Sequence, residues 1–172
     1  AGFAQPQHWN QSNLLYAAEG LEPELTAQAL GKVVEHHDAL RMTYRVIEGR
    51  VRQYNRKTDE GELFTLTVRQ AAADETAREI AELEGEKLQR SFDLASGPLL
   101  KAALVQKDGA SYLALVAHHL VVDSLSWEFI LEDFETAYLQ AESGEKIVLP
   151  PKTDSYQAWA QGLAEYAKSG AL

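Results

Sequence analysis

The strongest constraint on the fold is a pair of apolar segments joined by a short turn. Residues 99–105 and 112–117 consist mainly of Leu, Val and Ala, and Asp108-Gly109 lies between them. An Asp-Gly pair between two apolar runs is typical of a tight β-hairpin, so we predict two antiparallel strands here. Residues 113–117 are all apolar, which predicts that the second strand is buried on both faces.

Four other segments have the apolar spacing of amphipathic helices, and three have the pattern of strands. The expected helices are residues 25–37, 74–90, 124–140 and 155–168. The expected strands are residues 40–47, 51–54 and 63–68, with a turn at 48–50. We predict that Asp74 caps its helix and that residues 149–152, which contain two consecutive prolines, form a linker. The mixture predicts an α/β fold with a largely antiparallel sheet and flanking helices.

Composition and charge exclude several classes of function. With 172 residues, the chain is long enough for one domain with a hydrophobic core. It has no cysteine, which excludes disulfides, zinc–thiolate sites and thiol nucleophiles, and fits a cytoplasmic protein. The net charge of −10 argues against nucleic-acid binding. No apolar run approaches the about 20 residues needed to cross a membrane. A small molecule or another protein remains as the expected partner.

Residues suited to chemistry gather where the apolar strand gives way to the helix 124–140. The sequence of residues 118–127 is H-H-L-V-V-D-S-L-S-W. Successive residues of a strand point to opposite faces, so one of His118 and His119 can face a cleft while the other packs inward. Histidine can move a proton in either direction near neutral pH. Asp123 can orient an imidazole or pair with a cation, and Ser124 or Ser126 can cap the helix.

Other interpretations of these residues stay open at this point. A pair of histidines is often structural or exposed, and we expect this of His36-His37 at a helix end. A serine hydrolase would need a G-x-S-x-G elbow, which the sequence lacks. A metal site would need a further ligand beside His118, His119 and Asp123.

Residues 118–123, with Ser126-Trp127 after them, resemble the H-H-x-x-x-D signature of condensation and epimerization domains in non-ribosomal peptide synthetases. Residues 8–12 (H-W-N-Q-S), Ser126-Trp127, and residues 149–153 leading to 155–160 are similar to the epimerization branch. Residues 37–41 and 91–94, with 97–99 after them, are similar to both branches. The resemblance extends from about Gln7 to Tyr166 and therefore covers nearly the whole chain.

The resemblance implies a chloramphenicol-acetyltransferase-like fold, in which two similar lobes face a channel, and a role for each matching residue. His119 would be the acid/base residue facing the channel, and His118 would pack inward and orient the loop. Asp123 would brace the motif by pairing with an arginine, for which Arg41 is the matching position. Trp127 would lie beside the site, although a core aromatic residue at the start of a helix is an equally open interpretation.

Two departures from the family pattern bear on activity. Ser124 stands where the family usually has glycine, so it would narrow the space or shift the backbone. The chain, residues 1–172, matches only the N-terminal lobe. The C-terminal lobe, with the glutamate expected opposite the histidine, would be absent. We therefore expect the isolated chain to be inactive and its uncovered face to favour self-association.

The reaction implied by the resemblance is inversion of the α-carbon of an aminoacyl or peptidyl thioester. The substrate would hang from the phosphopantetheine of a peptidyl carrier protein domain, and the chain itself would bind no cofactor or metal. One alternative is a condensation domain, in which His119 assists attack of an amine on the thioester. A non-catalytic carrier-docking module is a second alternative, and a free-standing acyltransferase is the weakest.

Overall fold

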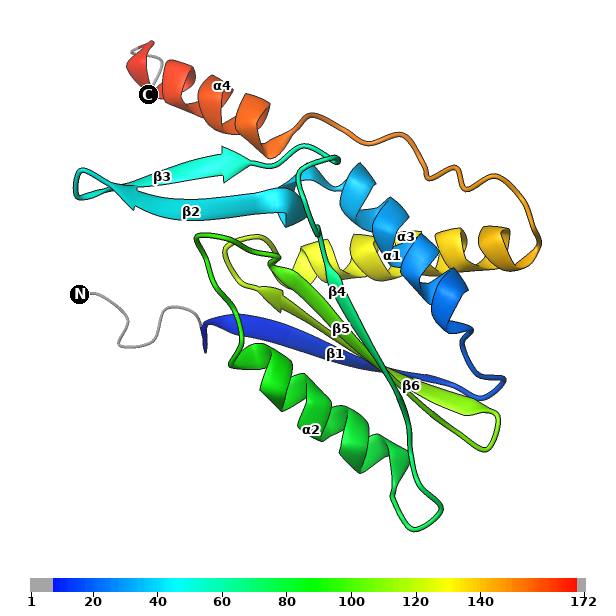
Figure 1. Cartoon of the computed structure of the whole chain (residues 1–172). Helices are drawn as coiled ribbons and strands as arrows, with labels where there is room; N and C mark the ends of the chain where they lie inside the picture. The colour runs from blue at the N-terminus through cyan, green and yellow to red at the C-terminus, as the bar shows by residue number, and fades with distance from the viewer. Residues whose placement is uncertain (1–7, 170–172) are drawn as a thin grey trace.

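The computed structural model of the chain describes residues 8–169 (Figure 1). The regular elements up to the middle of the chain are β1 (Asn10–Ala17), α1 (Pro23–His36), the 3-10 turn η2 (Asp38–Arg41), β2 (Met42–Ile47), β3 (Arg50–Asn55) and β4 (Thr65–Gln70). They are followed by α2 (Ala77–Gln89), β5 (Leu100–Lys107), β6 (Ala110–His118), α3 (Ser124–Glu142) and α4 (Tyr156–Lys168). The order confirms the predicted α/β class.

Four of the strands form one sheet in the order β1-β6-β5-β4, and β2 pairs with β3 in a separate two-stranded ribbon. Strand β6 is antiparallel to both of its neighbours, whereas β4 runs parallel to β5. Figure 1 shows α2 against one face of the four-stranded sheet and α1 with α3 on the other. The sheet therefore has helices on both faces, with β6 in its interior.

The predicted hairpin is formed by β5 and β6. Lys107 pairs with Ala110, so the loop consists of Asp108 and Gly109 alone. Both residues have positive φ angles, 51° and 84°, as the tight turn of a hairpin requires. Leu115 and Val116 point to opposite faces of β6 and both are fully buried, which confirms the prediction of a doubly covered strand.

Strand β1 was not predicted from the sequence. Its first four residues, 10–13, are polar, so the segment lacks the apolar alternation that identifies a strand. In the structure it lies along the edge of the sheet, where Asn10 pairs with His118 and Gln11 with Ala117. This pairing brings residues 9–11 beside the histidine pair.

Some predicted boundaries shift because local turns replace the start of an element. The strand predicted for 40–47 begins at Met42, since Asp38–Arg41 form a 3-10 turn directly after α1. The strand predicted for 63–68 is Thr65–Gln70. The prediction that Asp74 caps a helix was wrong. The cap of α2 is Thr76, and the Glu75 carboxylate instead accepts the backbone N–H of Ala72.

The C-terminal helix α4 lies away from the sheet and has no buried residue (Figure 1). The segment before it, residues 145–155, has no regular structure, as the two prolines predicted. In α4 the predicted apolar residues Trp159, Leu163 and Tyr166 are all exposed. Among the helices formed by residues 8–169, none combines the length and apolar composition needed to cross a membrane.

Candidate active site

The loop between β6 and α3 is held from several sides. The backbone N–H of His118 donates to the Leu99 carbonyl (3.0 Å), and that of His119 donates to the Trp9 carbonyl (2.9 Å). Val121 and Val122 are buried in the hydrophobic core below the loop. The core and both neighbouring segments therefore fix the backbone at His119.

From the ribbon side, Tyr44 of β2 holds the same loop. Its hydroxyl donates to the Leu120 carbonyl at 3.0 Å. Burial, with the nearby Tyr156, raises the pKa of Tyr44 to about 12, so the phenol keeps its proton and remains a donor at neutral pH. Tyr44 was not among the predicted site residues, because a tyrosine in an alternating strand gives no sequence signal of this contact.

His118 packs inward, in the position that the resemblance implied for it. It is 1% exposed, and the edges or faces of Phe92 and Trp9 surround its ring at centroid distances of 5.9 and 6.4 Å. Its Nδ1 atom accepts the backbone N–H of Leu120 at 3.2 Å. An accepting Nδ1 carries no proton, so His118 is a neutral residue that fixes the loop from within.

His119 is half-buried and contacts two residues of the N-terminal segment. Its ring faces that of Trp9 with centroids 4.6 Å apart, and its Nε2 atom is 3.5 Å from the side-chain amide nitrogen of Gln11. On the other side of the ring, Nδ1 is 2.7 Å from the Val122 carbonyl. A carbonyl can only accept, so Nδ1 carries a proton and donates it to Val122.

Trp127 completes this group of residues. It is 6% exposed and belongs to the hydrophobic core, yet its indole N–H donates to the Gln11 side-chain oxygen at 3.2 Å. Trp127 therefore packs in the core and also contacts a neighbour of His119. Trp9 and Gln11 belong to the segment H-W-N-Q-S, but sequence reasoning gave them no role because their proximity to His119 depends on the pairing of β1.

Asp123 caps α3. Its Oδ1 atom accepts the backbone N–H of Ser126 at 2.7 Å and the Ser126 hydroxyl at 2.6 Å. These two hydrogen bonds hold the pKa of the Asp123 carboxyl below its usual value of 3.8, and the nearby His119 acts in the same direction more weakly. The expectation that Ser124 or Ser126 caps the helix was therefore wrong, because the carboxylate occupies the capping position.

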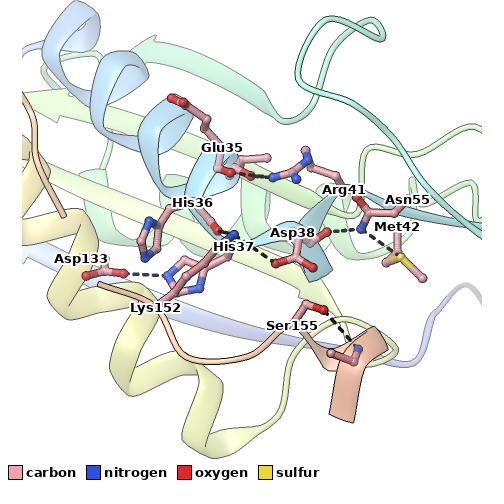
Figure 2. A network of polar contacts seen from close by, with 12 residues as sticks. Glu35, His36, His37, Asp38, Arg41, Met42, Asn55, Asp133, Lys152 and Ser155 are labelled. Atoms are coloured by element: carbon pink, nitrogen blue, oxygen red, sulfur yellow. Dashed lines mark hydrogen bonds and ion pairs between the residues drawn. The ribbon is translucent and has the colours of Figure 1, made fainter. Parts of the chain in front are cut away.

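The structure does not form the expected pair between Asp123 and Arg41. Arg41 follows the C-terminus of α1 in the chain, so its guanidinium reaches the carbonyls that the helix leaves unpaired. It donates to the carbonyls of Val34 (2.6 Å), Glu35 (2.7 Å) and Arg56 (3.0 Å), as Figure 2 shows in part. Arg41 thus ties α1 to the segment after β3.

Ser124 is the first residue of α3 and is exposed. Among the described residues, the non-glycine positions with positive φ are Glu48 and Asp108. Ser124 therefore has a backbone that any residue adopts, and no conformation reserved for glycine is needed where the family usually has one.

His36, His37 and Asp133 form a second polar cluster, shown in Figure 2. Their possible ligand atoms lie within 4.8 Å of one another, beside a cavity of about 510 Å³ that the three residues line in part. His37 Nε2 and Asp133 Oδ2 are already hydrogen-bonded at 2.7 Å. Burial lowers the pKa of His36, and the neighbouring His37 and Lys152 act in the same direction. The cluster joins α1 to α3, which fits the expectation that His36-His37 is structural.

Comparison with known proteins identifies relatives over the whole chain. Residues 3–172 match the family model of the condensation domain. Tyrocidine synthase 1 of Brevibacillus parabrevis is 43% identical over 170 residues, which are 99% of this chain and 16% of the relative. Surfactin synthase subunit 1 of Bacillus subtilis (strain 168) is 44% identical over 172 residues, which are 99% of this chain and 5% of the relative.

Solved structures agree with these relatives. The epimerization domain from the third module of tyrocidine synthetase B superposes with a TM-score of 0.91 at 40% identity, covering 97% of this chain and 38% of that one. The starter condensation domain of rhizomide synthetase gives a TM-score of 0.81 at 18% identity, covering 95% and 39%. The second match shows the fold alone. Together they confirm the predicted chloramphenicol-acetyltransferase-like fold. This chain spans less than two fifths of the length of each matched chain.

Proposed function

This chain belongs to the condensation-domain family of non-ribosomal peptide synthetases, and from that premise we propose that it forms the histidine-bearing lobe of an epimerization domain. The observation that carries the proposal is that two epimerization-like segments contact each other beside His119. Gln11, from residues 8–12, and Trp127 are hydrogen-bonded to each other, and Gln11 lies 3.5 Å from His119 Nε2. The 40% identity to a solved epimerization domain supports the same choice.

The chemistry asks for a base that can take a proton from carbon. A thioester acidifies the α-proton, since the electron pair left by breaking the Cα–H bond spreads onto the carbonyl oxygen. His119 Nε2 would form the new N–H bond, and its imidazolium would be held by the Val122 carbonyl at Nδ1. A proton returned to the opposite face of the α-carbon then gives the other epimer. That step needs a second acid/base group, which we propose is the glutamate of a second lobe.

Partners follow from the same proposal. The substrate would be carried on the phosphopantetheine of a peptidyl carrier protein domain, which the chain would contact without binding a cofactor of its own. Exposed apolar side chains at the start of α3 (Leu125, Phe129) and along α4 (Tyr156, Trp159, Leu163, Tyr166) support a second lobe that covers them. Isomerase activity would then belong to the two lobes together.

The test is exchange of the α-proton in heavy water. An aminoacyl thioester on a carrier domain is incubated with the synthetase protein that contains this chain, in native form and as His119→Ala. We expect deuterium wash-in with loss of stereochemical purity, reduced about 100-fold or more by the substitution. His36→Ala, which removes a histidine outside the site, is the matched control and should retain the native rate.

Condensation is the second candidate, because the family model that matches residues 3–172 is that of condensation domains. In that reaction His119 Nε2 would assist attack of an amine on the thioester carbonyl. Absence of wash-in from the native protein, together with amide formation when an aminoacyl acceptor is added, would replace epimerization by condensation. Carrier binding without either product would indicate a docking module.

A further inference from the structure

We infer that Gln11 is a positioning residue that, oriented by Trp127, keeps His119 in the neutral form with a free Nε2. This inference rests on the proposed function for its meaning in catalysis, but its geometry stands on the described residues alone. It concerns which protonation state His119 adopts before substrate reacts, a property that His119 and its loop do not settle by themselves.

The Trp127 indole decides which end of the Gln11 amide faces the histidine. An indole nitrogen is a donor only, so the group 3.2 Å from it must be the amide oxygen. The amide NH2 is then the end that lies 3.5 Å from His119 Nε2. Since Trp127 is buried in the core, this orientation is held by a rigid side chain.

An NH2 group beside Nε2 disfavours every form of His119 that carries a proton there. Both the Nε2–H tautomer and the imidazolium would place an N–H against the N–H of Gln11. The neutral Nδ1–H form instead offers a lone pair to the amide and a proton to the Val122 carbonyl at 2.7 Å. The two contacts on opposite sides of the ring therefore select the same state, which is the one a general base needs.

The charge near the site acts in the other direction. The nearby His119 helps to lower the pKa of the Asp123 carboxyl, and a carboxylate attracts a positively charged ring in the same way. That carboxylate is engaged by the backbone N–H and hydroxyl of Ser126. Gln11 therefore opposes the field of Asp123. If the Gln11 amide were reversed, its oxygen would accept from an imidazolium and His119 would rest as an acid.

Gln11→Glu tests this by imposing the reversed arrangement, since a carboxylate has acceptors at both ends. Nitrogen-15 NMR of the chain distinguishes the Nδ1–H ring from the imidazolium. For native protein we expect the His119 signals of the Nδ1–H tautomer, and for Gln11→Glu those of the imidazolium at the same pH. In the synthetase protein, the rate of deuterium wash-in catalysed by the Gln11→Glu variant should fall about 10- to 100-fold at neutral pH. The rate should recover as the pH is raised.

Two further variants keep the inference falsifiable. Gln11→Met preserves length without an amide or a charge, and should show a mixture of His119 forms with an about tenfold slower exchange. Gln53→Glu adds the same charge on exposed β3 and should behave as native. Native ring signals and a native rate–pH curve in both Gln11 variants would overturn the inference. If the native protein shows the Nδ1–H tautomer but catalyses no exchange of the α-proton, the proposed function is overturned and the inference about Gln11 stands.

Discussion

Asp123 has a structural role in the site that can be measured separately from catalysis. It caps α3, and the hydrogen bonds from Ser126 that make it a cap also hold its pKa below 3.8. Because the pKa is lowered in the folded state, the stabilisation is present above the ordinary value and is lost as the pH falls through the folded one. The role that the structure shows for Asp123 is therefore that of a helix cap, and not of an ion-pair partner of Arg41.

We predict that Asp123→Ala lowers the free energy of unfolding by about 1 kcal/mol at pH 7, the usual cost of losing an N-cap. Asp123→Asn should lose only a few tenths, since its amide oxygen can still accept from Ser126. Urea unfolding at pH 7 and near pH 3 measures both. The deficit of the Ala variant should shrink at the lower pH. An equal deficit at both values would contradict the assignment of the cap to the carboxylate.

Arg41 is the residue for which family pattern and structure disagree. We predict that Arg41→Ala and Asp123→Ala destabilise additively, within about 0.5 kcal/mol, because the two side chains have no partner in common. A double-mutant cycle by urea unfolding measures the coupling. A coupling above about 1 kcal/mol would restore the ion pair that the resemblance implied. Ser126→Ala with Asp123→Ala is the positive control, since those two are in contact and should couple.

At the scale of elements, local signals carried some predictions further than others. The hairpin of β5 and β6 was predictable because its turn and both strands are adjacent in sequence. Strand β1 was not, because its place depends on pairing between positions 10–17 and 111–118, about 100 residues apart. The parallel pairing of β4 with β5 across α2 was missed for the same reason.

The candidate site divides in the same way. His118, His119 and Asp123 are close in sequence, so their association could be predicted from the motif. The contribution of Gln11 arises only when β1 pairs with β6, and that of Tyr44 only when β2 lies over the loop. Arg41 was placed wrongly because its guanidinium satisfies nearby helix carbonyls, which a sequence pattern does not reveal.

One contact between elements is testable through glycine. Gly20, between β1 and α1, has φ of +77°, and a Cβ there would lie 2.7 Å from the backbone oxygen of Gly109 in the β5–β6 turn. Gly144 has φ of +69° with nothing within 4 Å. We predict that Gly144→Ala costs about 1 kcal/mol for the backbone alone, and Gly20→Ala clearly more. Thermal or urea unfolding of the two variants compares their losses of stability. Equal losses would mean that the two turns are not in contact.

At the scale of the whole molecule, helix α4 exposes an apolar face that no contact within residues 8–169 buries. Tyr156 and Trp159 are 65% and 57% exposed, and Leu163 and Tyr166 follow on the same helix. Apolar patches of this kind are typical of surfaces that meet a partner. We propose that a second lobe covers them in the intact domain, so the isolated chain leaves them open to a second copy.

We predict that the isolated chain self-associates in a concentration-dependent way through this face. Sedimentation velocity over a range of concentrations should show dimer or larger species for native protein, because pairing removes apolar surface from water. Trp159→Glu and Leu163→Glu should shift the chain to monomer, since each would bury a charge in the contact. Leu83→Glu, on the exposed side of α2, is the matched control and should associate as native does. A native chain that stays monomeric at the highest concentration would remove the argument that α4 presents a contact surface. Association abolished by all three variants alike would show that added charge, rather than the α4 face, controls it.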